Sequence, residues 1–189
     1  MAARRKPEDS RTRLIAAATA VLGEHGWIGA SSRRIAASAG LNLSLISYYF
    51  GSLDGLLLAV VRDATQHLVD HTANCFHAGD LVALAETALR LVDDPQVRPA
   101  LRVLTEASIQ ASRDADLAVE IQRYLLDFRA SLYHPIARAL GSAAKPDVIT
   151  AAAELLAATL DGLLLHRAIG LEFKLAPLWA TLLRMHADR

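Results

Sequence analysis

The residues of this sequence best suited to chemistry lie between positions 31 and 49. Hydroxyl, amide and guanidinium groups gather there, on Ser31, Arg33, Asn42, Ser44, Ser47, Tyr48 and Tyr49. Such groups form hydrogen bonds. The sequence contains no nucleophile motif, no phosphate-binding loop and no paired-carboxylate signature. The chemistry that this stretch offers is therefore hydrogen bonding rather than bond breaking.

Two short helices are predicted to position these side chains. Ser31 is a good N-cap for a helix whose apolar residues recur at helical spacing, namely Ile35, Ala36 and Ala39. Gly40 ends this helix, because glycine adopts the left-handed conformation at the lowest cost. Asn42 caps the second helix, which places Ile46, Tyr49 and Phe50 on one face and Ser44, Leu45, Ser47 and Tyr48 on the other. This arrangement is a helix-turn-helix.

The same stretch resembles the DNA-binding segment of the TetR family of transcriptional regulators. The matching residues are Ile35-Ala36, Ala39-Gly40 and the run SYYFGSLDGLL from Ser47 to Leu57. The resemblance is strong over residues 10–57 and looser beyond, where LDGLLLHRAIG at 160–170 looks like the family's ligand and dimer domain. It implies an all-α fold, with an N-terminal three-helix helix-turn-helix domain at 1–52 and a C-terminal helical domain for effector binding and dimerisation at 53–189.

Two residues depart from the family pattern. Family members usually carry lysine at the position of Leu53 and often at that of Leu43. Lysines there would hold phosphates, so this segment is less cationic than the pattern. The predicted reading face also lacks the side chains that make bidentate contacts to guanine or adenine, apart from the capping Asn42. Hydroxyl groups, a leucine that meets a thymine methyl, and DNA shape remain as means of readout.

Charge is distributed unevenly along a chain whose formal net charge is zero. Residues 1–52 hold seven basic and three acidic side chains, a net of +4, so the remainder carries −4. A basic first quarter is where a phosphate backbone would dock. We expect Arg4, Arg5 and Lys6 to form a disordered arm that reaches the backbone or the minor groove. The acidic and basic residues before LIAAATAVLG argue against a secretory signal.

The rest of the chain is predicted to be helical. Strand patterns are absent, and the single Cys75 excludes a disulfide framework and suits a reducing cytoplasm. Glycine and proline positions predict helices at 10–25, 55–75, 81–91, 100–111, 116–140, 147–169 and 175–187. The apolar run 155–165 contains Asp161 and is too short to span a bilayer, so no membrane is expected.

Assembly and effector binding follow from the resemblance and from the helical faces. A palindromic operator on double-stranded DNA needs a homodimer. We expect its interface to contain small and apolar residues of the last two helices, Ala153, Ala157, Gly162, Leu178 and Leu182. A small, largely hydrophobic effector would bind among the inward faces of the middle helices, against His71, Thr105, Ser108, Tyr124 and Phe128.

The sequence therefore predicts a cytoplasmic, ligand-responsive DNA-binding regulator, most often a repressor, that is not an enzyme and needs no cofactor or metal. Three alternatives stay open. His67, His71, Cys75 and His77 have metal-ligand spacing, although one helical row often carries such residues without a metal. A helical enzyme has weaker support. A helical interaction protein that has lost DNA binding is the third, motivated by Leu43 and Leu53.

Overall fold

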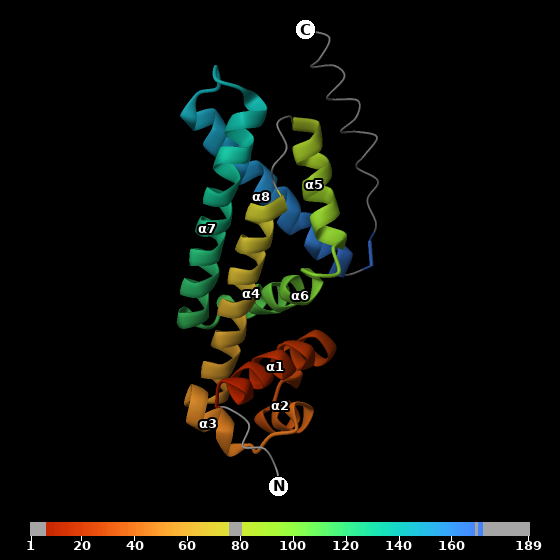
Figure 1. Ribbon diagram of the computed structural model, residues 1–189, viewed down its shortest axis with the longest axis vertical. Coiled ribbons are helices and arrows are strands. Elements are labelled where there is room, and N and C mark those ends of the chain that lie inside the picture. Colours follow the sequence, from red (N-terminus) through yellow and green to blue (C-terminus); the bar gives the residue numbers. More distant parts are fainter. Residues whose placement is uncertain (1–6, 76–80, 169, 172–189) are drawn as a thin grey trace. The chain divides into compact units, whose positions relative to one another are not determined.

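The computed structural model describes residues 7–75, 81–168 and 170–171, and the described chain consists of α-helices joined by turns, with no strand (Figure 1). The helices within these ranges are α1 (Pro7–Gly29), α2 (Ser32–Ala39), α3 (Ser44–Phe50), α4 (Leu53–Cys75), α5 (Leu81–Asp93), α6 (Arg98–Ala111), α7 (Ala115–Leu140) and α8 (Pro146–Ala168). The predicted all-α fold class is confirmed.

Two helices extend past their predicted ends for local reasons. Gly26 has non-helical backbone angles (φ 66°, ψ −177°), yet the helix resumes beyond it and α1 continues to Gly29. Pro99 lies in the first turn of α6, where its missing N–H has no intrahelical partner to lose, so this helix begins at Arg98. The predicted helix at 175–187 lies outside the described residues.

The contacts between residues divide the chain into two compact units. The first unit contains residues Met1–His67 and Pro99–Gln122, and the second contains Leu68–Arg98 and Arg123–Arg189. The helix-turn-helix thus packs together with most of α4, with α6 and with the first turns of α7.

The first unit has a continuous apolar core beneath the helix-turn-helix. Helix α1 contacts both α2 and α3. The side chains that fill the space between these helices and the start of α4 are almost completely buried, among them Leu14, Leu22, Ile35, Ile46 and Leu56. Each contributes about 1.5–3 kcal/mol by leaving water. This core holds the two short helices, which are too short to be stable alone.

In the second unit, α5 packs on α8. An ion pair joins them at the surface, with Nη2 of Arg167 2.8 Å from Oδ2 of Asp93. Apolar side chains of both helices are buried in this unit, including Leu84, Ala88, Ala153 and Ala157.

The burial of Ala153 and Ala157 corrects part of the predicted dimer interface. Their exposed fractions are 3% and 0% in a single chain, so these side chains face the protomer's own interior. Gly162 is half-buried, and Leu178 and Leu182 lie outside the described residues. The face of α8 that remains open carries larger apolar side chains, with Val148, Leu155 and Leu165 exposed by 49%, 70% and 54%.

Helix α8 is also notable for its apolar composition. Over Pro146–Arg167 the helix is long and apolar enough, by length and composition alone, to cross a membrane. Core helices pass the same test, and α8 carries Asp161 and Glu154 within that length. Only 24% of its most apolar stretch is buried within the chain.

Candidate nucleic-acid interface

The first helix of the predicted helix-turn-helix is capped at both ends as its sequence indicates. Ser31 is extended (φ −139°, ψ 149°), and its hydroxyl oxygen accepts a hydrogen bond from the backbone N–H of Arg34 at 3.3 Å. At the other end Gly40 is left-handed (φ 61°, ψ 39°), and the N–H of Leu41 donates to the carbonyl of Ala36 at 3.0 Å. These caps fix where the turn begins.

The side chain of Asn42 lies at the start of the second helix, α3, and caps it. Its Oδ1 accepts hydrogen bonds from the backbone N–H and from the hydroxyl of Ser44, both at 2.9 Å. Ile46, 1% exposed, anchors the helix in the core. Because Ile46 faces inward, the residues one and two positions after it turn outward, and Ser47 and Tyr48 are exposed.

The start of α4 depends on a close backbone approach. The hydroxyl of Ser52 accepts from the N–H of Gly55 at 3.0 Å, which caps this helix as its sequence predicts. A Cβ placed on Gly55 would lie 2.1 Å from the carbonyl oxygen of Phe50, closer than any real contact. Only glycine fits here without moving the end of α3.

All but one of the predicted DNA-contacting residues are exposed to solvent. Ser31, Arg33, Asn42, Ser44, Ser47 and Tyr48 are exposed, whereas Tyr49 is half-buried. Tyr48 is 76% exposed, and its ring meets the ring of Tyr49 edge-on at 4.8 Å between centroids. Exposed aromatic hydroxyls held by ring contacts are presented rigidly to any partner.

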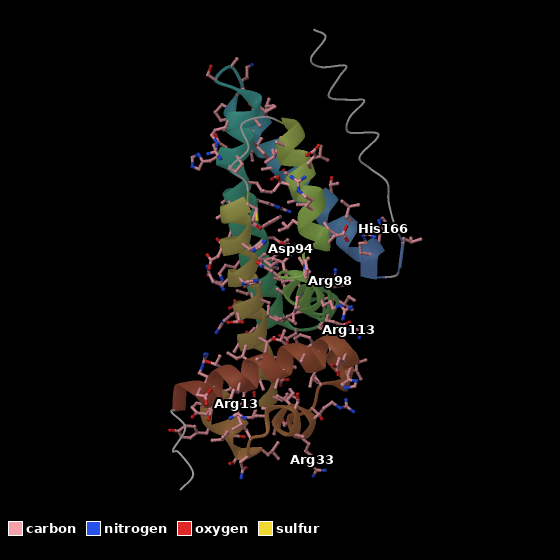
Figure 2. All side chains as sticks on the ribbon, turned by 45° about the vertical axis from the view of Figure 1, so that its right-hand side comes forward. Arg13, Arg33, Asp94, Arg98, Arg113 and His166 are labelled. Atoms are coloured by element: carbon pink, nitrogen blue, oxygen red, sulfur yellow. The ribbon has the colours of Figure 1, made fainter. Side chains whose placement is uncertain are left out.

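The arginines near the helix-turn-helix fall into two groups. Arg33 extends from α2 away from the ribbon (Figure 2). Three others are engaged by the protein itself. Arg34 donates to the carbonyl of Gly29, Arg13 donates to that of Ala39 at 2.5 Å, and the Arg11 guanidinium stacks 5.3 Å over the Phe50 ring. Sequence reasoning placed Arg33 among the DNA-contacting residues and assigned no contact to the other three. Residues 4–6, the predicted basic arm, lie outside the described residues.

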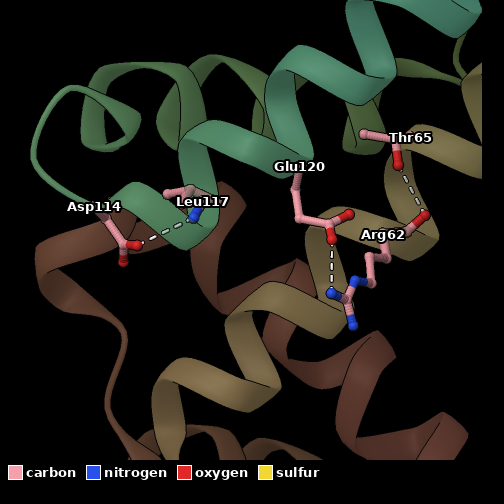
Figure 3. Close-up of polar contacts among 5 residues, drawn as sticks. All are labelled: Arg62, Thr65, Asp114, Leu117 and Glu120. Atoms are coloured by element: carbon pink, nitrogen blue, oxygen red, sulfur yellow. Dashed lines mark hydrogen bonds and ion pairs between the residues drawn. The ribbon is translucent and has the colours of Figure 1, made fainter.

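Two polar contacts tie α1 and α4, the helices on either side of the helix-turn-helix, to distant parts of the same unit. Oε2 of Glu106, on α6, accepts a hydrogen bond from the backbone N–H of Trp27 at 2.9 Å, directly after the break in α1 at Gly26. On α7, Oε1 of the buried Glu120 lies 2.6 Å from Nη2 of Arg62 (Figure 3). The hydrogen bond to this carboxylate raises the pKa of Arg62. Sequence reasoning missed both pairs, because their members are more than fifty residues apart.

The predicted effector residues are distributed over both units. Thr105 and Ser108 belong to the first unit; the Thr105 hydroxyl donates to the carbonyl of Leu101 at 3.0 Å, and Ser108 is exposed rather than inward-facing as predicted. His71, Tyr124 and Phe128 belong to the second. Tyr124 and Phe128 are buried and stack with centroids 5.7 Å apart, and burial, with a smaller contribution from the Asp161 carboxylate, raises the pKa of Tyr124.

The histidine of this set has a carboxylate partner. Nε2 of His71 lies 3.1 Å from Oδ2 of Asp94, and both side chains are largely buried. Burial and the nearby charge of Asp94 raise the pKa of the Cys75 thiol. Within the described ranges no three acidic, histidine or cysteine side chains are placed to hold a metal ion, and His77 lies outside them.

These features define the class of the molecule: an all-helical protein with an N-terminal helix-turn-helix whose recognition helix is exposed. Residues 14–60 match the family model described as bacterial regulatory proteins, tetR family. The resemblance to the TetR family inferred from the sequence is confirmed by this match, by relatives and by solved structures.

Relatives and solved structures agree with this assignment. The HTH-type transcriptional dual regulator CecR of Shigella flexneri is 38% identical over 109 residues, which cover 58% of this chain and 44% of that protein. The chain thus spans less than half the length of this relative. A transcriptional regulator from Rhodococcus sp. Rha1 is 26% identical with a TM-score of 0.71, over 82% of both chains. A Saccharomonospora viridis protein crystallised with choline shares the fold at 17% identity, with a TM-score of 0.74 over 96% of this chain and 97% of that one. The named relatives are transcriptional regulators, not enzymes.

Proposed function

We propose that this protein is a cytoplasmic, ligand-responsive transcriptional regulator, acting as a repressor, that binds a palindromic operator as a homodimer. The observation that carries the proposal is the exposed face of α3, with Ser47 and Tyr48 outward and Ile46 anchored in the core. Helix α3 would enter the major groove, where Ser44, Ser47, Tyr48 and Tyr49 meet phosphates or base edges. Ser31, Arg33 and Asn42 would contact the flanking backbone.

Support for repression comes from relatives. A transcriptional repressor of Corynebacterium glutamicum, AcnR, is 27% identical over 114 residues, which cover 60% of this chain and 57% of that protein. A repressor needs only to occupy its operator and leave when its ligand binds. A ligand that achieves a near-complete switch must favour one state by about 5.5 kcal/mol.

The proposed dimer uses the open face of α8. Val148, Leu155 and Leu165 form an apolar surface that a second copy would cover through a twofold axis. Replacement of Leu155 by Glu places a charge in this surface and should give monomers in sedimentation velocity. Glu replacement of the exposed Ile109, on α6, is the matched control and should leave the dimer intact. A Leu155→Glu protein that sediments as the wild type would refute the interface.

The proposed effector is a small, largely apolar molecule. The stacked, buried rings of Tyr124 and Phe128 offer an apolar and aromatic surface with a hydroxyl, and His71, in the same unit, would supply a further polar group. The choline complex of the protein from Saccharomonospora viridis indicates that this fold accommodates a small organic molecule. Compounds that raise the melting temperature should therefore change operator affinity, and Phe128→Ala should abolish both effects.

The test of DNA binding is selection of DNA by the purified protein from its own genome, followed by titration at several salt concentrations. A regulator should recover one palindromic sequence and bind it with an affinity that falls steeply with salt. Recovery of no sequence would refute the proposal. That outcome would favour the second candidate, a helical interaction protein, which the exposed Leu43 in place of a phosphate-binding lysine supports.

A further inference from the structure

The polar groups at the start of α3 are partly committed within the protein. The backbone N–H and the hydroxyl of Ser44 both donate to Oδ1 of Asn42 at 2.9 Å. The hydroxyl proton of Ser44 and the amide oxygen of Asn42 are therefore occupied in capping the helix. The Ser44 oxygen can still accept hydrogen bonds and the Asn42 amide nitrogen can still donate them, so an apolar contact at the first turn of α3 would add to hydrogen bonding with the bases.

Leu43 lies between these two capping residues. Its backbone is already helical (φ −52°, ψ −38°), and its side chain makes no capping bond. The side chain is 44% exposed, whereas Ile46, three residues later, is 1% exposed and supplies the contact with the core. Leu43 thus keeps almost half of its side chain exposed at the start of the helix. It places an aliphatic group on the surface that the proposed function assigns to the major groove.

The major groove offers such a group one specific partner. The C5-methyl of thymine is the apolar feature by which a T·A pair differs from the others, and aliphatic side chains recognise it by contact. An exposed lysine at this position would instead hold a phosphate and carry no sequence information. A leucine at this position therefore offers sequence specificity rather than attraction to the phosphate backbone.

We propose that Leu43 is a specificity-determining residue that contacts the methyl group of a thymine at one fixed position in each operator half-site. The inference rests on the proposed function, because it requires α3 to bind in the major groove. Removal of the methyl group alone should weaken binding by about fourfold for one half-site and about fifteenfold for both, from the free energy of burying one such group.

The experiment changes the DNA rather than the protein. An operator is first selected from a random pool, and each thymine is then replaced in turn by deoxyuridine, which lacks only the methyl group. The affinity of the wild-type protein should fall about fourfold when deoxyuridine replaces thymine at one position, and the same loss should occur at the symmetry-related position of the other half-site. Leu43→Ala should bind thymine and deoxyuridine at that position equally. Leu53→Ala, at the other leucine that departs from the family pattern, is the matched control and should keep the wild-type discrimination.

The outcomes separate the inference from the proposed function. If the pool yields no specific sequence, the proposed function fails and the inference fails with it. If a specific operator emerges but no deoxyuridine position distinguishes wild type from Leu43→Ala, only the inference is overturned. Misfolding of Leu43→Ala cannot decide the matter, since the wild-type protein with the deoxyuridine series must by itself show the predicted position. A selected operator without thymine in either half-site also overturns the inference.

Discussion

The hydrogen bond between Glu106 and the Trp27 amide should decide how firmly the end of α1 is held. Gly26 breaks the helical conformation of α1, so the N–H of Trp27 needs an acceptor from elsewhere, and Oε2 of Glu106 supplies it at 2.9 Å. Glu106→Ala removes this acceptor and leaves the amide without its partner in a half-buried position. Glu106→Gln keeps an acceptor but removes the charge.

The magnitude follows from the kind of bond. A hydrogen bond to a charged group contributes about 1.5–3 kcal/mol when enclosed, and the partial exposure of Glu106 lowers this to about 1–2 kcal/mol. For a chain of this size the melting temperature should fall by about 2–8 °C in Glu106→Ala. Glu106→Gln should show about half the effect, because neutral hydrogen bonds are roughly half as strong.

Hydrogen exchange measures the bond directly. The Trp27 amide should exchange about 5–30 times faster in Glu106→Ala than in the wild type, if local opening limits exchange. The control is Glu86→Ala, which removes an exposed carboxylate 3.4 Å from Arg90 on α5 and should change stability by less than about 0.5 kcal/mol. Unchanged protection of the Trp27 amide in Glu106→Ala would refute the reasoning, whatever the melting temperature does.

Three further predictions concern the reading surface and the single cysteine. Tyr48→Ala should weaken operator binding by about 1–3 kcal/mol in a fluorescence titration, with unchanged sedimentation; equal affinity would remove Tyr48 from the interface. Gly55→Ala should reduce both thermal stability and operator affinity, because its Cβ would lie 2.1 Å from the Phe50 carbonyl oxygen; a variant with wild-type values would show that this approach is not needed. Burial and the charge of Asp94 raise the pKa of Cys75, so this thiol carries less thiolate at any given pH than an unperturbed thiol. The rate of its alkylation by iodoacetamide should therefore increase at a higher pH in the folded protein than in the protein unfolded in urea. Coincident pH profiles in the two states would contradict that shift.

The helix-turn-helix was predictable because its signals are local. Ser31, Asn42 and Ser52 accept hydrogen bonds from amides two or three residues away, and Gly40 adopts the left-handed conformation within its own turn. Such interactions need no distant partner, so residue type and spacing determine them. The alternation of buried Ile46 with exposed Tyr48 follows in the same way from helical periodicity.

Roles that depend on distant partners were decided only by the tertiary structure. The sequence assigned no partner to Arg34, and only the fold brings the carbonyl of Gly29 to it. Small residues predicted a helix interface at Ala157, and the structure buries that residue inside its own protomer. Sequence periodicity identifies an apolar or small-residue face without saying which molecule will cover it, because that choice depends on the helices that pack beside it.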